Sequence, residues 1–195
     1  IPLDEKVNLV RRKYIMSLEN AQENLKEFGK ELGLEGLEFD ENNTCILGID
    51  DQFSMHLTFE PNSDRLYIYS PILDGLPKDD KLKLVLFEKL LEGSMLGGQM
   101  AGGGVGVAVE EELILLHCTI DMAYAIPSAL RAFAPLYVET VERWRKIAEE
   151  VLSGKEIDVS PKAVAEQQAQ KAQEIKPNTG PSALGGGGHE GFIKI

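Results

Sequence analysis

The stretch "MLGGQMAGGGVGVAV", residues 95–109, places six glycines among small apolar side chains. It follows a helical pattern and precedes two strand patterns, whereas the glycines of dinucleotide-binding and P-loop sites follow a strand and open a helix. The spacing differs as well, because Val109 stands where the third glycine of GxGxxG belongs and Gly104 stands where a P-loop needs lysine. The sequence therefore predicts a flexible connection over 97–104 and then a strand, and it argues against a nucleotide-dependent enzyme.

The segments on either side of the glycines have periodic apolar patterns that define the fold class. Residues 53–59, "FSMHLTF", alternate strictly between apolar and polar side chains, which is typical of a strand. In chain order, the patterns predict a helix over 18–32, strands at 44–49, 53–59 and 65–73, a helix over 80–93, strands at 105–109 and 113–120, and a helix over 127–152. This order predicts an α+β fold with a mostly antiparallel, twisted sheet and flanking helices.

The two ends of the chain differ from this central part. Met16 stands directly before the first helical pattern, so residues 1–15 are interpreted as a non-native or upstream extension. Residues 154–195 pass from an Ala/Gln-rich piece to a Gly/Pro run, which is typical of a flexible low-complexity tail with one or two helical turns around 163–172. The expected domain therefore occupies residues 16–153.

The composition limits the classes of partner. The chain has 195 residues and a formal net charge of −12. The acid excess lies between the two ends, which leaves no basic footprint for nucleic acid or for an anionic membrane. No run approaches the roughly 18 apolar residues of a membrane-inserted helix, and the N-terminus lacks the pattern of a secretory signal. The sequence predicts a cytoplasmic protein.

Catalytic and metal-ligating patterns are weak throughout the sequence. Cys45 and Cys118 are far apart and form no CxxC motif. His117 precedes Cys118 in a predicted strand, so the two side chains point to opposite faces of the sheet. The other histidines, His56 and His189, have no carboxylate or cysteine at metal-ligand spacing. The sequence predicts no enzyme, no cofactor and no metal site.

The predicted helix over 80–93 is apolar around most of its circumference. One domain face cannot bury all of these side chains, and such a helix lies either in a large core or at an oligomer interface. Because the expected core is of ordinary size and has few helices, an interface between two copies is favoured. The residues assigned to this homodimer interface are Val85, Leu86, Leu90 and Leu91.

Three stretches carry a family resemblance: "NNTCILGIDDQFSMHLTFE", "DRLYIYSPILDGLP" and "EKLLEGSMLGGQMAGGGVGVA", followed by a final helix with Trp144. Together they closely resemble the chlamydial SycE-like members of the class I type III secretion chaperones, the Tir chaperone family. The resemblance covers about residues 17–150. It implies a cytosolic homodimer without enzymatic activity. Such chaperones bind the N-terminal segments of secreted effector proteins, keep them secretion-competent and deliver them to components of the secretion apparatus.

The expected effector-binding surface lies where the first helix borders the strand at 53–59. Methionine suits a surface that must accept varied sequences, because its flexible side chain adapts to different partners. The residues assigned to effector binding are Leu25, Phe28, Phe53, Met55, Leu57 and Phe59. Alternation alone does not say which sheet face is covered. Plain core positions are therefore the alternative, with the cargo surface then on the face of Tyr67 and Tyr69.

One alternative function has the same fold but belongs to another class. A cytosolic dimeric scaffold or regulatory protein would share the predicted elements and the homodimer, without a role in secretion. Co-purification of N-terminal effector segments separates the two hypotheses.

Overall fold

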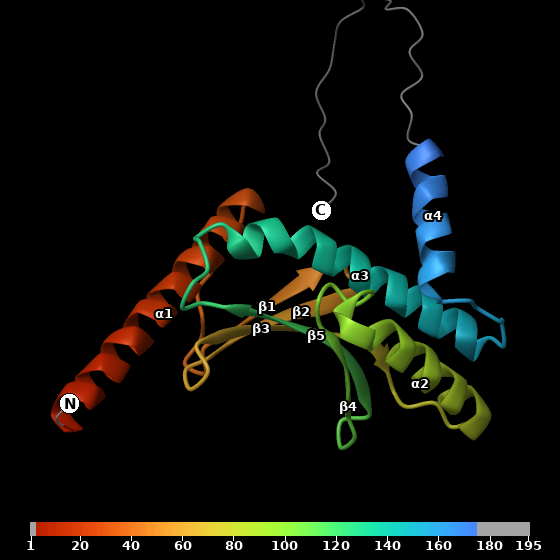
Figure 1. The fold of residues 1–195 in the computed structure, drawn as a ribbon, viewed down its shortest axis with the longest axis horizontal. Coiled ribbons are helices and arrows are strands. Elements are labelled where there is room, and N and C mark those ends of the chain that lie inside the picture. The colour runs from red at the N-terminus through yellow and green to blue at the C-terminus, as the bar shows by residue number, and fades with distance from the viewer. Residues whose placement is uncertain (1–2, 175–195) are drawn as a thin grey trace, which may run out of the picture. The chain divides into compact units, whose positions relative to one another are not determined.

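The computed structural model describes residues 3–174, and the side-chain environments of residues 16–170 except Gln168. The chain divides into two compact units, residues 1–157 and residues 158–195. The first unit contains a five-stranded sheet and three α-helices (Figure 1). The second contains helix α4, Pro161–Glu174.

The sheet is a three-stranded meander extended by a hairpin. Its strands are β1 (Thr44–Ile49), β2 (Phe53–Glu60), β3 (Arg65–Asp74), β4 (Gly104–Ala108) and β5 (Leu113–Asp121). The spatial order is β1-β2-β3-β5-β4, and every neighbouring pair is antiparallel. The central strand β3 therefore has β2 on one side and β5 on the other.

The remaining elements of the first unit are three α-helices and a short 3-10 turn. They are α1 (Leu3–Glu31), α2 (Asp80–Ser94), the short 3-10 turn η1 (Met95–Gly97) and α3 (Ala129–Leu152). Helix α3 contacts α1, α2, β3 and β5, and α2 also contacts β4. Figure 1 shows α3 running along the sheet, with α1 at one end and α2 at the other.

The core lies between α3 and the sheet. Along β2 every second side chain is buried, which is the pattern that the strict alternation of its sequence predicts. From α3, Tyr137 and Trp144 are the largest fully buried side chains. The hydroxyl of Tyr137 donates a hydrogen bond to the carbonyl of Leu116 on β5 at 3.1 Å, so this buried polar group is satisfied.

The predicted α+β fold and its antiparallel sheet are confirmed, and the differences lie at the ends of the chain. Helix α1 begins at Leu3, because residues 3–15 contain many strong helix formers and neither glycine nor proline. It thus runs through the segment interpreted as an extension. In the predicted tail, α4 is longer than the one or two turns expected. The Gly/Pro-rich part of that tail, residues 175–195, lies outside the described residues.

Candidate functional site

The six residues predicted to bind effector lie in the core. Leu25, Met55 and Leu57 are fully buried, and the exposed fraction of the other three does not exceed 8%. These side chains belong to the helix-covered side of the sheet, so a partner could contact them only if a helix moved away. The described surface has no open groove lined by Leu25, Phe28, Phe53, Met55, Leu57 and Phe59. The alternative, plain core positions, accounts for their environment.

The other face of the sheet carries partly exposed polar and aromatic side chains. The rings of His56 and Tyr69 stack with their centroids 4.9 Å apart. Ser54 Oγ lies 2.9 Å from His56 Nε2, and Thr58 Oγ1 lies 3.3 Å from the hydroxyl of Tyr69. Partial burial lowers the pKa of His56, which favours its neutral form. This hydrogen-bonded face is the one to which the sequence assigned the alternative cargo surface.

Helix α2 is apolar on two sides, of which one is buried. Leu86 and Leu90 are 0% and 2% exposed, so they pack in the core of their own chain and present little surface to a second copy. Val85 and Leu91 are 41% and 67% exposed and remain accessible to a partner. The exposed apolar residues of this region, here called the α2 surface, are Leu84, Val85, Leu91, Met95, Leu96 and Val107.

The glycine stretch forms a compact turn between α2 and β4. Gly97 has a φ of +68°, and a Cβ at that position would lie 2.6 Å from the carbonyl carbon of Gly102. Gly103 packs against β5 so closely that a Cβ would lie 1.9 Å from the carbonyl oxygen of His117. Only glycine fits such backbone-to-backbone approaches. The glycines therefore have a structural role, but they form a compact, hydrogen-bonded turn and not the flexible connection that the sequence predicted.

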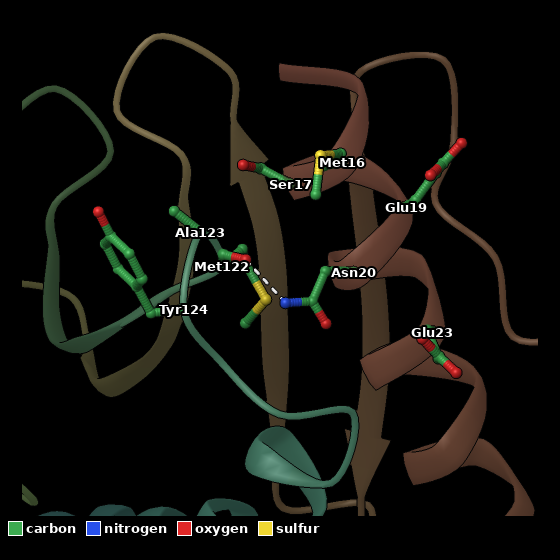
Figure 2. Close-up of a pocket in the computed structure, with 8 residues that line it drawn as sticks. All are labelled: Met16, Ser17, Glu19, Asn20, Glu23, Met122, Ala123 and Tyr124. Atoms are coloured by element: carbon green, nitrogen blue, oxygen red, sulfur yellow. Dashed lines mark hydrogen bonds between the residues drawn. The ribbon is translucent and has the colours of Figure 1, made fainter. Parts of the chain in front are cut away.

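A pocket that the sequence analysis did not predict opens between α1 and the segment that joins β5 to α3 (Figure 2). Its volume is about 450 Å³, which is in the usual range for sites that hold a small ligand. The residues that line it are Met16, Ser17, Glu19, Asn20, Glu23, Met122, Ala123 and Tyr124.

Two asparagines on α1 hold the wall of this pocket in place. Asn20 Nδ2 donates to the carbonyls of Met122 and Ala125, both at 2.7 Å, and Figure 2 shows the first of these bonds. One turn later, Asn24 Nδ2 donates to the carbonyl of Ile126 at 3.1 Å. The pocket is thus formed before any partner arrives. The sequence did contain a signal, because two asparagines four residues apart lie among the buried positions of an amphipathic helix.

The pocket combines apolar and acidic groups. Met16 and Tyr124 are 68% and 84% exposed, so much of their apolar surface faces solvent. Glu19 and Glu23 supply two carboxylates from α1, and no lysine or arginine is among the residues that line the pocket. Its chemistry suits a peptide that presents an apolar side chain next to a basic one.

A match to a protein family spans most of the first unit. The model of the Tir chaperone protein (CesT) family matches residues 23–145, from the middle of α1 to most of α3. The chain belongs to this family. The match includes the whole sheet, the α2 surface and the glycine turn, and it confirms the family resemblance seen in the sequence. A search of curated proteins finds no match.

Solved structures similar to this Tir chaperone family member share its fold. One is the HopA1–SchA chaperone–effector complex, with a TM-score of 0.54 and 23% identity over 67% of this chain and 97% of that chain. Another is the ExsC–ExsE complex, with a TM-score of 0.53 and 19% identity over 76% of this chain and 97% of that chain. At these identities the likeness concerns the fold.

Two further classes of site are absent from residues 3–174 of the Tir chaperone family member. None of the helices described there is long and apolar enough to cross a membrane. The same residues include no group of three or more His, Cys, Asp or Glu side chains placed to hold a metal ion. The candidate sites on the described surface are the sheet face with Tyr67 and Tyr69, the pocket at α1 and the α2 surface.

Proposed function

We propose that this member of the Tir chaperone family is a type III secretion chaperone. It binds N-terminal segments of effector proteins in the cytosol, keeps them secretion-competent and delivers them to the secretion apparatus. The family match over residues 23–145 carries this proposal. It is supported by the similar structure that is described as a chaperone–effector complex. The protein acts by binding and not by catalysis.

Effector segments contact the pocket at α1. The pocket is open and preorganised by Asn20 and Asn24. Its lining combines apolar side chains with Ser17, Asn20 and the carboxylates of Glu19 and Glu23. A preorganised wall lowers the entropy lost on binding, because the loop after β5 is already ordered. The two carboxylates favour basic residues in the bound segment.

The protein forms a homodimer through the α2 surface. Large apolar side chains gather there on a helix whose opposite side is already buried in the core, and Leu91 and Met95 are 67% and 70% exposed. Exposed apolar groups that adjoin one another on a rigid element mark an interaction surface. Dimerisation would remove this area from water.

The test of the proposed function begins with effector identification. The full chain is purified from its native cytoplasm, bound proteins are identified by mass spectrometry, and their N-terminal segments are tested for direct binding and for chaperone-dependent secretion. Secreted proteins bound through their N-terminal segments support the proposal. If every bound protein stays in the cell with and without the chaperone, the dimeric scaffold becomes the better reading.

A paired charge reversal tests the pocket. Glu19→Lys with Glu23→Lys reverses the charge of the lining, and we expect at least about tenfold weaker binding of an identified effector segment. Glu35→Lys with Glu38→Lys makes the same charge change at exposed positions outside the pocket and should leave binding within about twofold. Circular dichroism checks that both variants fold. Equal binding by the two variants would place the effector elsewhere.

A further inference from the structure

Leu96 adopts a backbone conformation that is unfavourable for leucine. Its φ of 54° and ψ of 20° lie in the left-handed region. For a residue with a Cβ this conformation costs about 1–3 kcal/mol, and it persists only where the surroundings enforce it. The side chain is 99% exposed, so packing within its own chain does little to offset the cost. A strained and fully exposed apolar residue requires an explanation outside the monomer.

The turn that follows enforces this conformation. The amide of Gly102 donates to the carbonyl of Gly97 at 2.9 Å, which closes the turn directly after Leu96. The indole Nε1 of Trp144 donates to the carbonyl of Gln99 at 2.9 Å and ties the turn to α3. Because Trp144 is fully buried, this hydrogen bond ties the turn to the core. Leu96 is therefore held in one position.

Leu96 extends an apolar stripe on α2. Leu84, Leu91 and Met95 recur at seven- and four-residue steps, a spacing that puts side chains on one side of a helix. All three are more than half exposed, and Leu96 adjoins Met95 at the end of the stripe. The stripe and Leu96 thus form one continuous part of the α2 surface.

We propose that Leu96 is an anchor residue for a second copy of the chain, and that the glycine turn exists to hold it at the dimer interface. This inference rests on the proposed homodimer and adds the residue that fixes its geometry. Surfaces that accept many partners are flexible, whereas a rigid, strained anchor suits a partner of constant shape. A second copy of the same chain is such a partner.

The charges of α2 are compatible with self-association. The chain as a whole carries −12, so two copies repel each other at a distance. Helix α2 carries no net charge, since its three lysines balance one aspartate and two glutamates. A surface with both signs of charge and no net charge can pair with itself across a two-fold axis. The apolar stripe therefore lies on a helix that adds no net repulsion when two copies of the chain approach each other.

Two glycine substitutions in the same turn distinguish the loss of the Leu96 side chain from the relief of backbone strain. Leu96→Gly removes the side chain and relieves the left-handed conformation. Ala101→Gly is the matched control, because Ala101 has a φ of 50° in the same turn and is not among the exposed apolar residues. Both variants should keep or raise the melting temperature of the wild type. The dimer dissociation constant is measured by sedimentation over a dilution series of the full chain.

Leu96→Gly should raise this dissociation constant at least about tenfold, and Leu96→Asn, which tolerates the left-handed conformation, should do the same. Ala101→Gly should change it by less than about twofold. If all three variants dimerise as tightly as the wild type, the anchor is disproved while the dimer stands. A wild type that remains monomeric at tens of micromolar overturns the proposed dimer and this inference with it.

Discussion

Cys118 shows how one residue ties the glycine turn to the sheet. Its thiol donates to the carbonyl of Met100 at 3.3 Å, and the side chain is 3% exposed. Burial raises the pKa of this thiol to about 11, because the thiolate would be poorly solvated there. The thiol is therefore a packing group, and its low thiolate content makes it a poor nucleophile.

The raised pKa of Cys118 predicts a loss of stability at high pH. In the unfolded chain the thiol titrates near pH 9, whereas in the folded chain it keeps its proton to about pH 11. Between these values the unfolded state binds fewer protons than the folded state. The contribution of the Cys118 thiol to the free energy of unfolding is therefore intact below pH 9 and declines as the pH rises toward 11. We expect the free energy of unfolding to fall by about 1 kcal/mol per pH unit in this range, as measured by urea unfolding at several pH values.

Cys118→Ala provides the control for this pH dependence. The variant retains the other groups that titrate in this range, including Cys45 and Tyr137, whose pKa values burial also raises. Its stability should decline less steeply than that of the wild type above pH 9. Parallel curves for the two proteins would show that the buried thiol does not contribute.

At the scale of elements, the leucines of helix α2 lie in two different environments and are expected to have two different roles. Leu86 is fully buried, so Leu86→Asp should unfold the chain by burying an unpaired charge. Leu91 is 67% exposed, so Leu91→Asp should leave the monomer folded and weaken the dimer. Thermal unfolding and sedimentation distinguish the two outcomes. A folded Leu86→Asp variant would contradict the division.

The limits of the sequence prediction also appear at the scale of elements. Periodicity predicted the helices and strands of the first unit, because 3.6-residue and two-residue repeats report which side chains share a face. It did not report which face another element covers. Phe53, Met55, Leu57 and Phe59 were grouped correctly but taken as an open border, although they lie in the core. Leu86 and Leu91 were likewise both assigned to the dimer interface, although they lie on different sides of the helix.

Periodicity could not predict the pocket at α1, for a different reason. It joins Asn20 on the first helix to Met122 after the last strand, about half the chain apart. Local patterns carry no information on which distant segments meet. A buried asparagine does indicate that a partner is needed, since an unpaired amide in a core is costly. It does not name the partner.

For the whole molecule, net charge should govern how binding responds to salt. Two chains of −12 repel each other, so raising NaCl from about 50 to about 500 mM should tighten the dimer by screening this repulsion. Binding of a basic effector segment to Glu19 and Glu23 should weaken over the same range. Sedimentation and a peptide titration at each salt concentration measure the two trends. Trends in the same direction would contradict this electrostatic account.

The pairing of β3 with β5 has a consequence for biosynthesis. Leu66 on β3 pairs with Ile120 on β5, and α2 and β4 are made between them. Closing so long a loop costs conformational entropy before the pairing can stabilise it, so this step is slow compared with the β1–β2–β3 meander. During synthesis on the ribosome, the β1–β2–β3 meander is complete before β5 and α3 have been made. Met55 and Leu57 therefore stay without the cover of α3 until the rest of the chain is synthesised. During this interval the nascent chain exposes its own core strands and is itself vulnerable to aggregation.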